Sequence, residues 1–148
     1  MGIEVETVTQ VTDELVTAVQ QLLPQLSTSA APLDAGKLAQ VIEHQAATLL
    51  IARSHGAIIG MLTLVMFPLP TGQRARIEDV VVDAAARGHG AGAALTTAAL
   101  RLAQQHGART IDLTSRASRV AANRLYERLG FALRDSKVYR YTGQAPAP

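Results

Sequence analysis

The chain has 148 residues, of which 48% are hydrophobic and 18% are charged, and its formal net charge is +2. A chain of this length forms one domain and buries about 70% of the surface that its unfolded form exposes. The small net charge and the 3% of aromatic residues argue against a nucleic-acid partner. The absence of cysteine excludes disulfides, cysteine metal sites and a thiol nucleophile. We expect a single domain over residues 1–148, with 143–148 as a disordered tail.

The ends and the apolar runs of the chain bear on its location. The N-terminus lacks the basic and apolar regions of a signal peptide. The longest apolar run, residues 57–70, reaches about two-thirds of the length that a membrane span needs. The histidines have no metal-ligand spacing. We therefore expect a cytoplasmic protein that binds neither a membrane nor a metal.

Apolar periodicity and turn residues predict the elements in chain order. Residues 3–9 begin with strand-like alternation, and Thr12 caps a helix that ends at residue 23, before Pro24. The elements that follow are a helix over 33–45, strands over 47–53, 57–67 and 76–83, a helix over 93–106, a strand over 109–114, a helix over 120–129, and strands over 131–133 and 137–141. The order β-α-α-β-β-β-α-β-α-β-β predicts an α/β fold with one central mixed sheet flanked by helices on both faces. The strand–helix–strand unit over 76–114 should be parallel with a right-handed crossover.

A glycine-rich turn lies between the strand over 76–83 and the helix that follows. Its sequence is Arg87-Gly88-His89-Gly90-Ala91-Gly92. A turn of this kind at a helix start directs backbone N–H groups at an anion, such as the phosphate of a cofactor. One candidate is a dinucleotide, because Gly88, Gly90 and Ala93 match G-x-G-x-x-G/A. The turn's position in the second half of the chain, and the residues 83–86 between the strand and the first glycine, argue against it.

Two segments together resemble another family. Arg87-x-x-Gly90-x-Gly92 resembles the [Q/R]-x-x-G-x-[G/A] signature of the GNAT superfamily of N-acetyltransferases. Residues 123–131, Asn-Arg-Leu-Tyr-Glu-Arg-Leu-Gly-Phe, resemble that family's N-x-x-[YF]-x-x-x-G-F helix. The strand over 77–82 resembles the family's central strand, and the resemblance covers roughly residues 47–141. It implies a GNAT-like domain with acetyl-coenzyme A as cosubstrate.

The resemblance also assigns roles to residues. In the family the turn receives the pyrophosphate of the coenzyme, the central strand pairs with the pantetheine, and the helix tyrosine protonates the leaving sulfur. Tyr126 is therefore the expected general acid. The expected cofactor-binding residues are Val80, Val81, Val82, Arg87, Gly88, His89, Gly90, Ala91, Gly92, Asn123 and Tyr126.

Glu78 is the candidate general base. Strand alternation puts Glu78, Val80 and Val82 on one face and Asp79 and Val81 on the other. In relatives that resemble spermidine and glucosamine-phosphate acetyltransferases, the glutamate of this Glu-Asp pair is implicated in deprotonating the acceptor, often through water. A solvated or salt-bridged strand residue is the alternative interpretation of Glu78. The histone-acetylating branch has its glutamate two positions earlier, where this chain has Arg76.

These assignments predict an acetyl-coenzyme A-dependent N-acetyltransferase that moves the acetyl group directly to a primary amine in a ternary complex. The amine belongs to a small molecule or to a peptide, and the small molecule is preferred because no charged docking surface stands out. The alternative is a non-catalytic acyl-coenzyme A sensor or interaction module on the same fold. Residues 137–141 suggest a homodimer by strand pairing.

Overall fold

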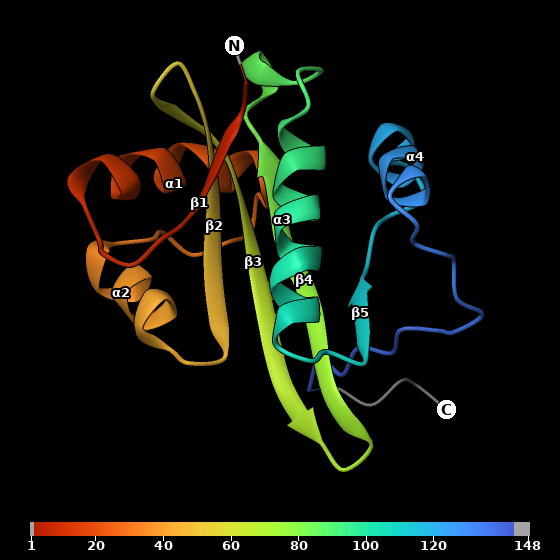
Figure 1. Cartoon of the computed structure of the whole chain (residues 1–148). Helices are drawn as coiled ribbons and strands as arrows, with labels where there is room; N and C mark the ends of the chain where they lie inside the picture. The colour runs from red at the N-terminus through yellow and green to blue at the C-terminus, as the bar shows by residue number, and fades with distance from the viewer. Residues whose placement is uncertain (1, 144–148) are drawn as a thin grey trace. The chain divides into compact units, whose positions relative to one another are not determined.

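The structure is a computed structural model that describes residues 2–143 (Figure 1). The chain divides into two compact units, Met1–Arg116 and Ala117–Pro148, which are described separately. The predicted disordered tail, 143–148, lies outside the described residues except for Gly143.

The first unit contains a five-stranded sheet with the order β1-β2-β3-β4-β5 (Figure 1). The strands β1 to β4 pair antiparallel, whereas β4 and β5 are parallel. The mixed sheet and the parallel pairing of β4 with β5 confirm the predicted α/β class. The strands are β1 Glu4–Thr7, β2 Ala47–Ser54, β3 Ala57–Leu69, β4 Gly72–Val82 and β5 Thr110–Leu113.

The three long helices of this unit are α1 Asp13–Leu26, α2 Ala35–Glu43 and α3 Ala91–Gln105. Thr12 caps α1 as predicted, because its Oγ1 accepts a hydrogen bond from the N–H of Leu15 at 3.1 Å. The prediction that this helix ends before Pro24 is wrong, since Pro24 lies inside α1. Proline removes one N–H donor, but the N–H of Ser27 still donates to the carbonyl of Leu23 at 2.9 Å and completes the last turn.

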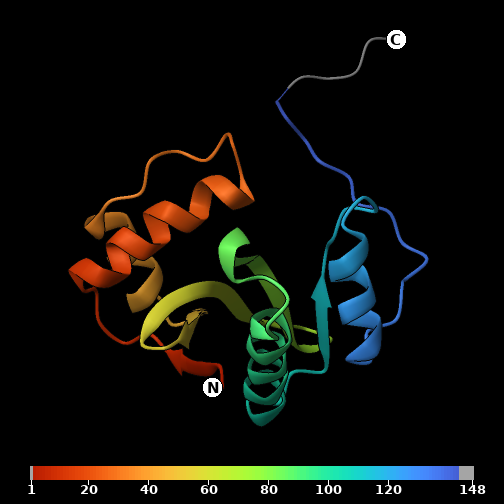
Figure 2. The same ribbon diagram turned by 90° about the horizontal axis from the view of Figure 1, so that it is seen from above.

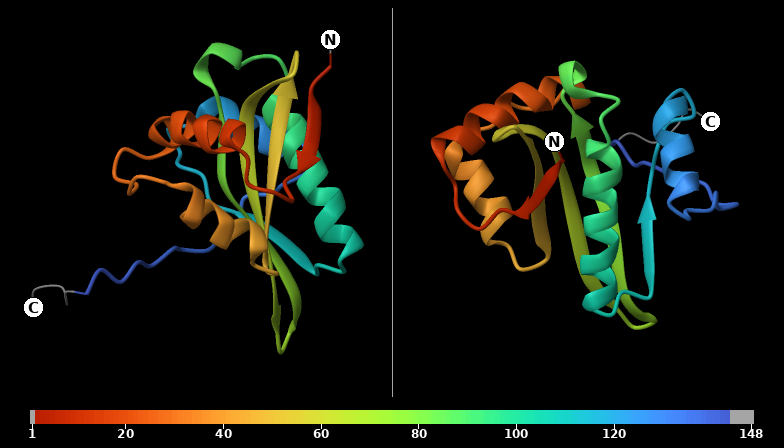
Figure 3. Two further views of the ribbon diagram at one scale, coloured as in Figure 1. Left: turned by 90° about the vertical axis from the view of Figure 1, so that its left-hand side faces the viewer. Right: turned by 45° about the horizontal axis from the view of Figure 1, so that its top comes forward.

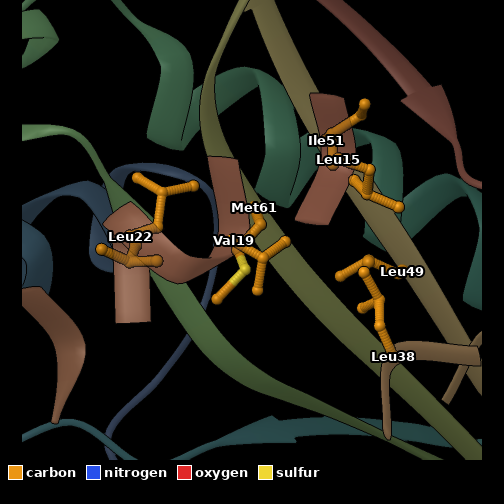
Figure 4. Close-up of a cluster of buried hydrophobic side chains, with 8 residues drawn as sticks. Leu15, Val19, Leu22, Leu38, Leu49, Ile51 and Met61 are labelled. Atoms are coloured by element: carbon orange, nitrogen blue, oxygen red, sulfur yellow. The ribbon is translucent and has the colours of Figure 1, made fainter. Parts of the chain in front are cut away.

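Helices cover both faces of this sheet, as predicted (Figures 2 and 3). On one face α1 and α2 pack on the sheet through a buried cluster, shown in Figure 4, of Leu15, Val19, Leu22, Leu38, Leu49, Ile51, Met61 and Val81. On the other face α3 approaches β3 closely at Gly60, where an added Cβ would lie 3.3 Å from Cδ1 of Leu95. β4, which carries Glu78, pairs with β3 on one side and with β5 on the other, so it lies in the interior of the sheet.

The second unit contains the helix α4 Val120–Arg128. The predicted strands over 131–133 and 137–141 are wrong, because these residues form no strand. A strand needs a partner edge for its N–H and C=O groups, and here Leu133 is 99% and Tyr139 87% exposed. Pairing of residues 137–141 across a homodimer stays a prediction. None of the helices in the part of the chain that the structure describes is long and apolar enough to span a membrane.

Candidate functional site

The glycine-rich turn begins directly after β4. Asp83 first caps the short 3-10 helix η1 Ala84–Ala86, since its Oδ1 accepts from the N–H of Ala85 at 3.1 Å. Gly88 and Gly90 then have φ angles of +85° and +90°, a region that side-chain-bearing residues rarely adopt. Gly90 is the N-cap of α3, so the turn leads directly into a helix N-terminus.

The backbone N–H groups of this turn are available to a ligand. Among the hydrogen bonds found within residues 2–143, none has an N–H of residues 88–92 as its donor. Gly90 has no side chain to cap α3, and the helix dipole adds partial positive charge at the same place. The structure therefore brings together the five amides that the sequence predicts as an anion site, from Gly88, His89, Gly90, Ala91 and Gly92.

Arg87 connects this turn to the end of β4. Its Nε donates to the carbonyl oxygen of Val82 at 3.3 Å, while the residue stays exposed to solvent. The guanidinium keeps further N–H donors for an anion, because an arginine carries five. Arg87 thus lies where a phosphate bound at the turn would meet positive charge.

The edge of β4 that faces β5 is only partly paired. The parallel ladder runs from Arg74 with Thr110 to Ile77 with Leu113, and it has no pair beyond that point in the described residues. Val80, Val81 and Val82 follow this point, so their backbone groups on that edge have no β5 partner. An extended ligand with amide groups can add to such an edge as a strand does.

A β-bulge lies in the same stretch of β4. Thr63 pairs with Glu78 and Met61 with Val81, so β4 has one residue more than β3 between these pairs. Asp79, inside this interval, has a φ of +52°. An extra residue of this kind bends the strand and shifts the phase of its side chains.

The bulge overturns the predicted facing of Glu78. Residues paired across strands share a face, and Thr63 and Met61 are two apart on β3, so Glu78 and Val81 lie on one face, the one that α1 covers. The prediction that groups Glu78 with Val80 and Val82, opposite Val81, is therefore wrong. Regular alternation fails because β4 has an inserted residue here. A run of valines in the sequence gives no sign of that insertion.

Two carboxyl groups adjoin the bulge, with different surroundings. Burial, and secondarily the charge of Glu78, raise the pKa of Asp79 above its ordinary value of 3.8. Glu78 instead forms an ion pair with Arg76, whose Nε lies 3.1 Å from Oε1 of Glu78. The guanidinium also donates from Nη2 to Oγ1 of Thr114 at 2.9 Å. The ion pair agrees with the alternative interpretation of Glu78 as a salt-bridged residue. Arg76 is not predicted from the sequence as its partner, although opposite charges two apart on a strand are the signal for such a pair.

The remaining predicted residues belong to the second unit. Asn123 and Tyr126 are three positions apart on α4, which puts them on one face of that helix. Tyr126 is 7% exposed, and its ring meets that of Phe131 edge to face with centroids 5.8 Å apart. Burial raises the pKa of the Tyr126 hydroxyl above 10. The roles predicted for Asn123 and Tyr126 remain predictions.

The fold and the turn define an α/β protein in which a helix N-terminus with undonated N–H groups follows an incompletely paired central strand. The sequence model of the Acetyltransferase (GNAT) family matches residues 15–131 of this chain. The chain therefore belongs to the GNAT family of acetyltransferases.

Solved structures share this fold over nearly the whole chain. A transcriptional regulator from Bacillus halodurans C-125 is 27% identical, with a TM-score of 0.76 over 93% of this chain and 99% of its own. A Trypanosoma brucei acetyltransferase is 25% identical, with a TM-score of 0.75 over 94% and 99%. A ribosomal-protein-alanine N-acetyltransferase from Brucella melitensis biovar Abortus 2308 is 22% identical, with a TM-score of 0.73 over 95% and 99%. A comparison with curated proteins found no match.

Proposed function

We propose that this protein is an acetyl-coenzyme A-dependent N-acetyltransferase that moves the acetyl group directly to a primary amine of a small molecule. The observation that carries the proposal is the group of undonated N–H groups at residues 88–92, at the start of α3. Such a site favours a phosphate-bearing donor. Membership of the GNAT family narrows that donor to an acyl-coenzyme A.

The residues present fit acetyl-coenzyme A. Arg87 and the amides of residues 88–92 would hold its pyrophosphate, and the unpaired edge of β4 at Val80, Val81 and Val82 would accept the amides of its pantetheine. By the family resemblance, Asn123 would contact the pantetheine as well. When bound, acetyl-coenzyme A supplies an activated thioester that accepts the amine and releases a thiol.

The protein's own residues would manage the protons. An amine is mostly protonated at neutral pH, so a base must take one proton before the nitrogen attacks. Oε1 of Glu78 is engaged by Arg76, which leaves Oε2 to accept that proton directly or through water. Tyr126 would supply a proton for the departing sulfur, since a tyrosine hydroxyl carries its proton at neutral pH. The chain has no cysteine, so the protein cannot carry the acetyl group as a thioester of its own. This favours direct transfer of the acetyl group to the amine.

Calorimetric titration with acetyl-coenzyme A, with NAD as the control ligand, tests the cofactor. We expect micromolar or tighter binding of acetyl-coenzyme A, about −8 kcal/mol or better, and none of NAD. Failure to bind acetyl-coenzyme A would overturn the proposal. Binding of NAD instead would favour the dinucleotide interpretation of the same glycines.

The variant Tyr126→Phe tests the chemistry. It removes the hydroxyl and keeps the ring that contacts Phe131. We expect unchanged affinity for acetyl-coenzyme A and a loss of turnover of about 100-fold or more, as for removal of a general acid. Unchanged turnover would contradict the role of Tyr126. Acetyl-coenzyme A binding without transfer to any amine, by the wild-type protein, would favour the non-catalytic binder.

A further inference from the structure

Arg76 joins two strands at the point where they stop pairing. Its Nε donates to Oε1 of Glu78 at 3.1 Å, and its Nη2 donates to Oγ1 of Thr114 at 2.9 Å, just after β5. The pair of Ile77 with Leu113 is the last of the parallel ladder between these strands. One guanidinium therefore contacts both the candidate base on β4 and the residue that follows β5.

Stability does not explain this arrangement. The side chains of Arg76 and Glu78 are 38% and 45% exposed. An ion pair at this exposure contributes only about 0–1 kcal/mol, because water competes for both charges. The arrangement instead orients a side chain, because a planar guanidinium held at two points fixes the orientation of the carboxylate that it binds. Oε2 of Glu78 accepts no hydrogen bond in the described part of the chain.

We propose that Arg76, anchored by Thr114, is a positioning residue that holds the Glu78 carboxylate with one oxygen bound and the other presented to the acceptor amine. This inference rests on the proposed function and adds two residues to it. A lysine at position 76 would supply charge but not the planar fork, so it should restore only part of the effect. Loss of the Thr114 hydroxyl should release the guanidinium at one of its two points.

The test compares steady-state kinetics of the full-length wild-type chain with Arg76→Met, Arg76→Lys and Thr114→Val. The amines are spermidine, glucosamine phosphate and an alanine-initiated peptide, with thiol release from acetyl-coenzyme A as the readout. For the amine that the wild type uses, we expect Arg76→Met to lower kcat about 10- to 100-fold, as misplacement of a reacting group does. The KM for acetyl-coenzyme A should stay within about twofold, since Arg76 contacts no residue of the glycine turn. Arg76→Lys and Thr114→Val should fall between Arg76→Met and the wild type.

Two controls separate positioning from a structural role. Arg74→Met alters the same strand two positions earlier, where the guanidinium donates to Oγ1 of Thr71 and not to Glu78, and its kcat should stay near the wild-type value. In a Glu78→Gln background, Arg76→Met should cause no further loss, because a residue that acts through Glu78 has nothing left to position. A full further loss in that background, or an equal loss in Arg74→Met, would overturn the inference and leave the proposed function intact. Absence of transfer by the wild type would overturn both.

Discussion

The side chain of Gln25, near the C-terminal end of α1, accepts a hydrogen bond through Oε1 from the backbone N–H of Ala84 at 2.8 Å. Its Nε2 donates to the carbonyl of Gln21 at 3.3 Å, which agrees with this orientation of the amide. Ala84 is the first residue of η1, four residues before the first glycine of the turn. The helix that leads into the loop of residues 27–34 is thereby tied to the approach to the anion-accepting turn.

Replacement of Gln25 should therefore weaken cofactor binding without unfolding the protein. A hydrogen bond of this kind contributes about 0.5–1.5 kcal/mol, so Gln25→Ala should raise the Kd for acetyl-coenzyme A by about 2- to 10-fold. Gln21→Ala, on the same helix, leaves the contact of Gln25 with Ala84 in place and is the matched control, with an affinity near that of the wild type. Titration calorimetry measures both, and equal affinity of Gln25→Ala and the wild type would show that this contact does not support the turn.

Gly90 tests the backbone conformation of the turn itself. An added Cβ would meet no atom within 4 Å, so space is not the obstacle, whereas the φ of +90° is. Gly90→Ala should lower the free energy of unfolding by about 1–2 kcal/mol, and it should weaken acetyl-coenzyme A binding because the amides rotate away. Gly36→Ala, in α2, is the control and should leave binding unchanged while stabilising the helix by up to about 1 kcal/mol. Urea unfolding measures the stability of both variants. A free energy of unfolding of Gly90→Ala equal to that of the wild type would show that alanine is not strained at this φ.

The negative charge of Asp79 should destabilise the folded protein at neutral pH. Its pKa is raised in the folded state, so the folded protein holds the proton more tightly and loses stability as pH rises from about 4. Asp79→Asn removes the charge and still tolerates the φ of +52°, so it should raise the free energy of unfolding at pH 7. The gain should vanish in acid, where the wild-type carboxyl is protonated.

The control for Asp79 is Asp79→Ala, which also removes the charge but adopts the left-handed conformation poorly. It should be less stable than Asp79→Asn at every pH. Urea unfolding at pH 3 and pH 7 separates the electrostatic effect from the conformational one. A pH-independent difference between Asp79→Asn and the wild type would rule out the electrostatic cause.

Sequence patterns predict most helices and strands of the first unit, because there the local signals agree with the burial of the side chains. The cap at Thr12 and the glycine-rich turn before α3 each satisfy a local chemical need, and the structure has both. The facing of Glu78 was not predictable, since a bulge is set by how β3 and β4 pair and not by the identity of three successive valines. The ion pair of Arg76 with Glu78 lies within β4, whereas the contact of Arg76 with Thr114 depends on the pairing of β4 with β5.

The segment after Gly130 shows the opposite limit of such patterns. Lys137-Val138-Tyr139-Arg140-Tyr141 is rich in β-branched and aromatic residues, which favour strands, yet no ladder forms, and Val138, Tyr139 and Tyr141 are exposed. The preference of these side chains for strands does not provide a neighbouring strand edge for their backbone N–H and C=O groups. The side chains of this segment therefore suit a strand, but within the described residues it pairs with no other strand.

Tyr126 provides the most direct test of the electrostatics of the candidate acid. Its burial disfavours the charged phenolate, so the pKa of its hydroxyl lies above 10. The chain has three tyrosines, and the double variant Tyr139→Phe/Tyr141→Phe leaves Tyr126 as the only one. Both substitutions fall on exposed rings, so the fold should be kept. Absorbance of the phenolate against pH then reports Tyr126 alone.

The midpoint of that titration should lie above 10, and it should fall to about 10 when urea unfolds the protein, as for a free tyrosine. The sign for stability follows: the folded state holds the proton more tightly, so the free energy of unfolding should decrease as pH rises past 10. Tyr126→Phe removes this group and should flatten that part of the pH dependence. A midpoint at or below 10 in the folded protein would mean that the phenolate is stabilised there. Tyr126 would then lose its proton at least as readily as a free tyrosine, and burial would not be what governs its titration.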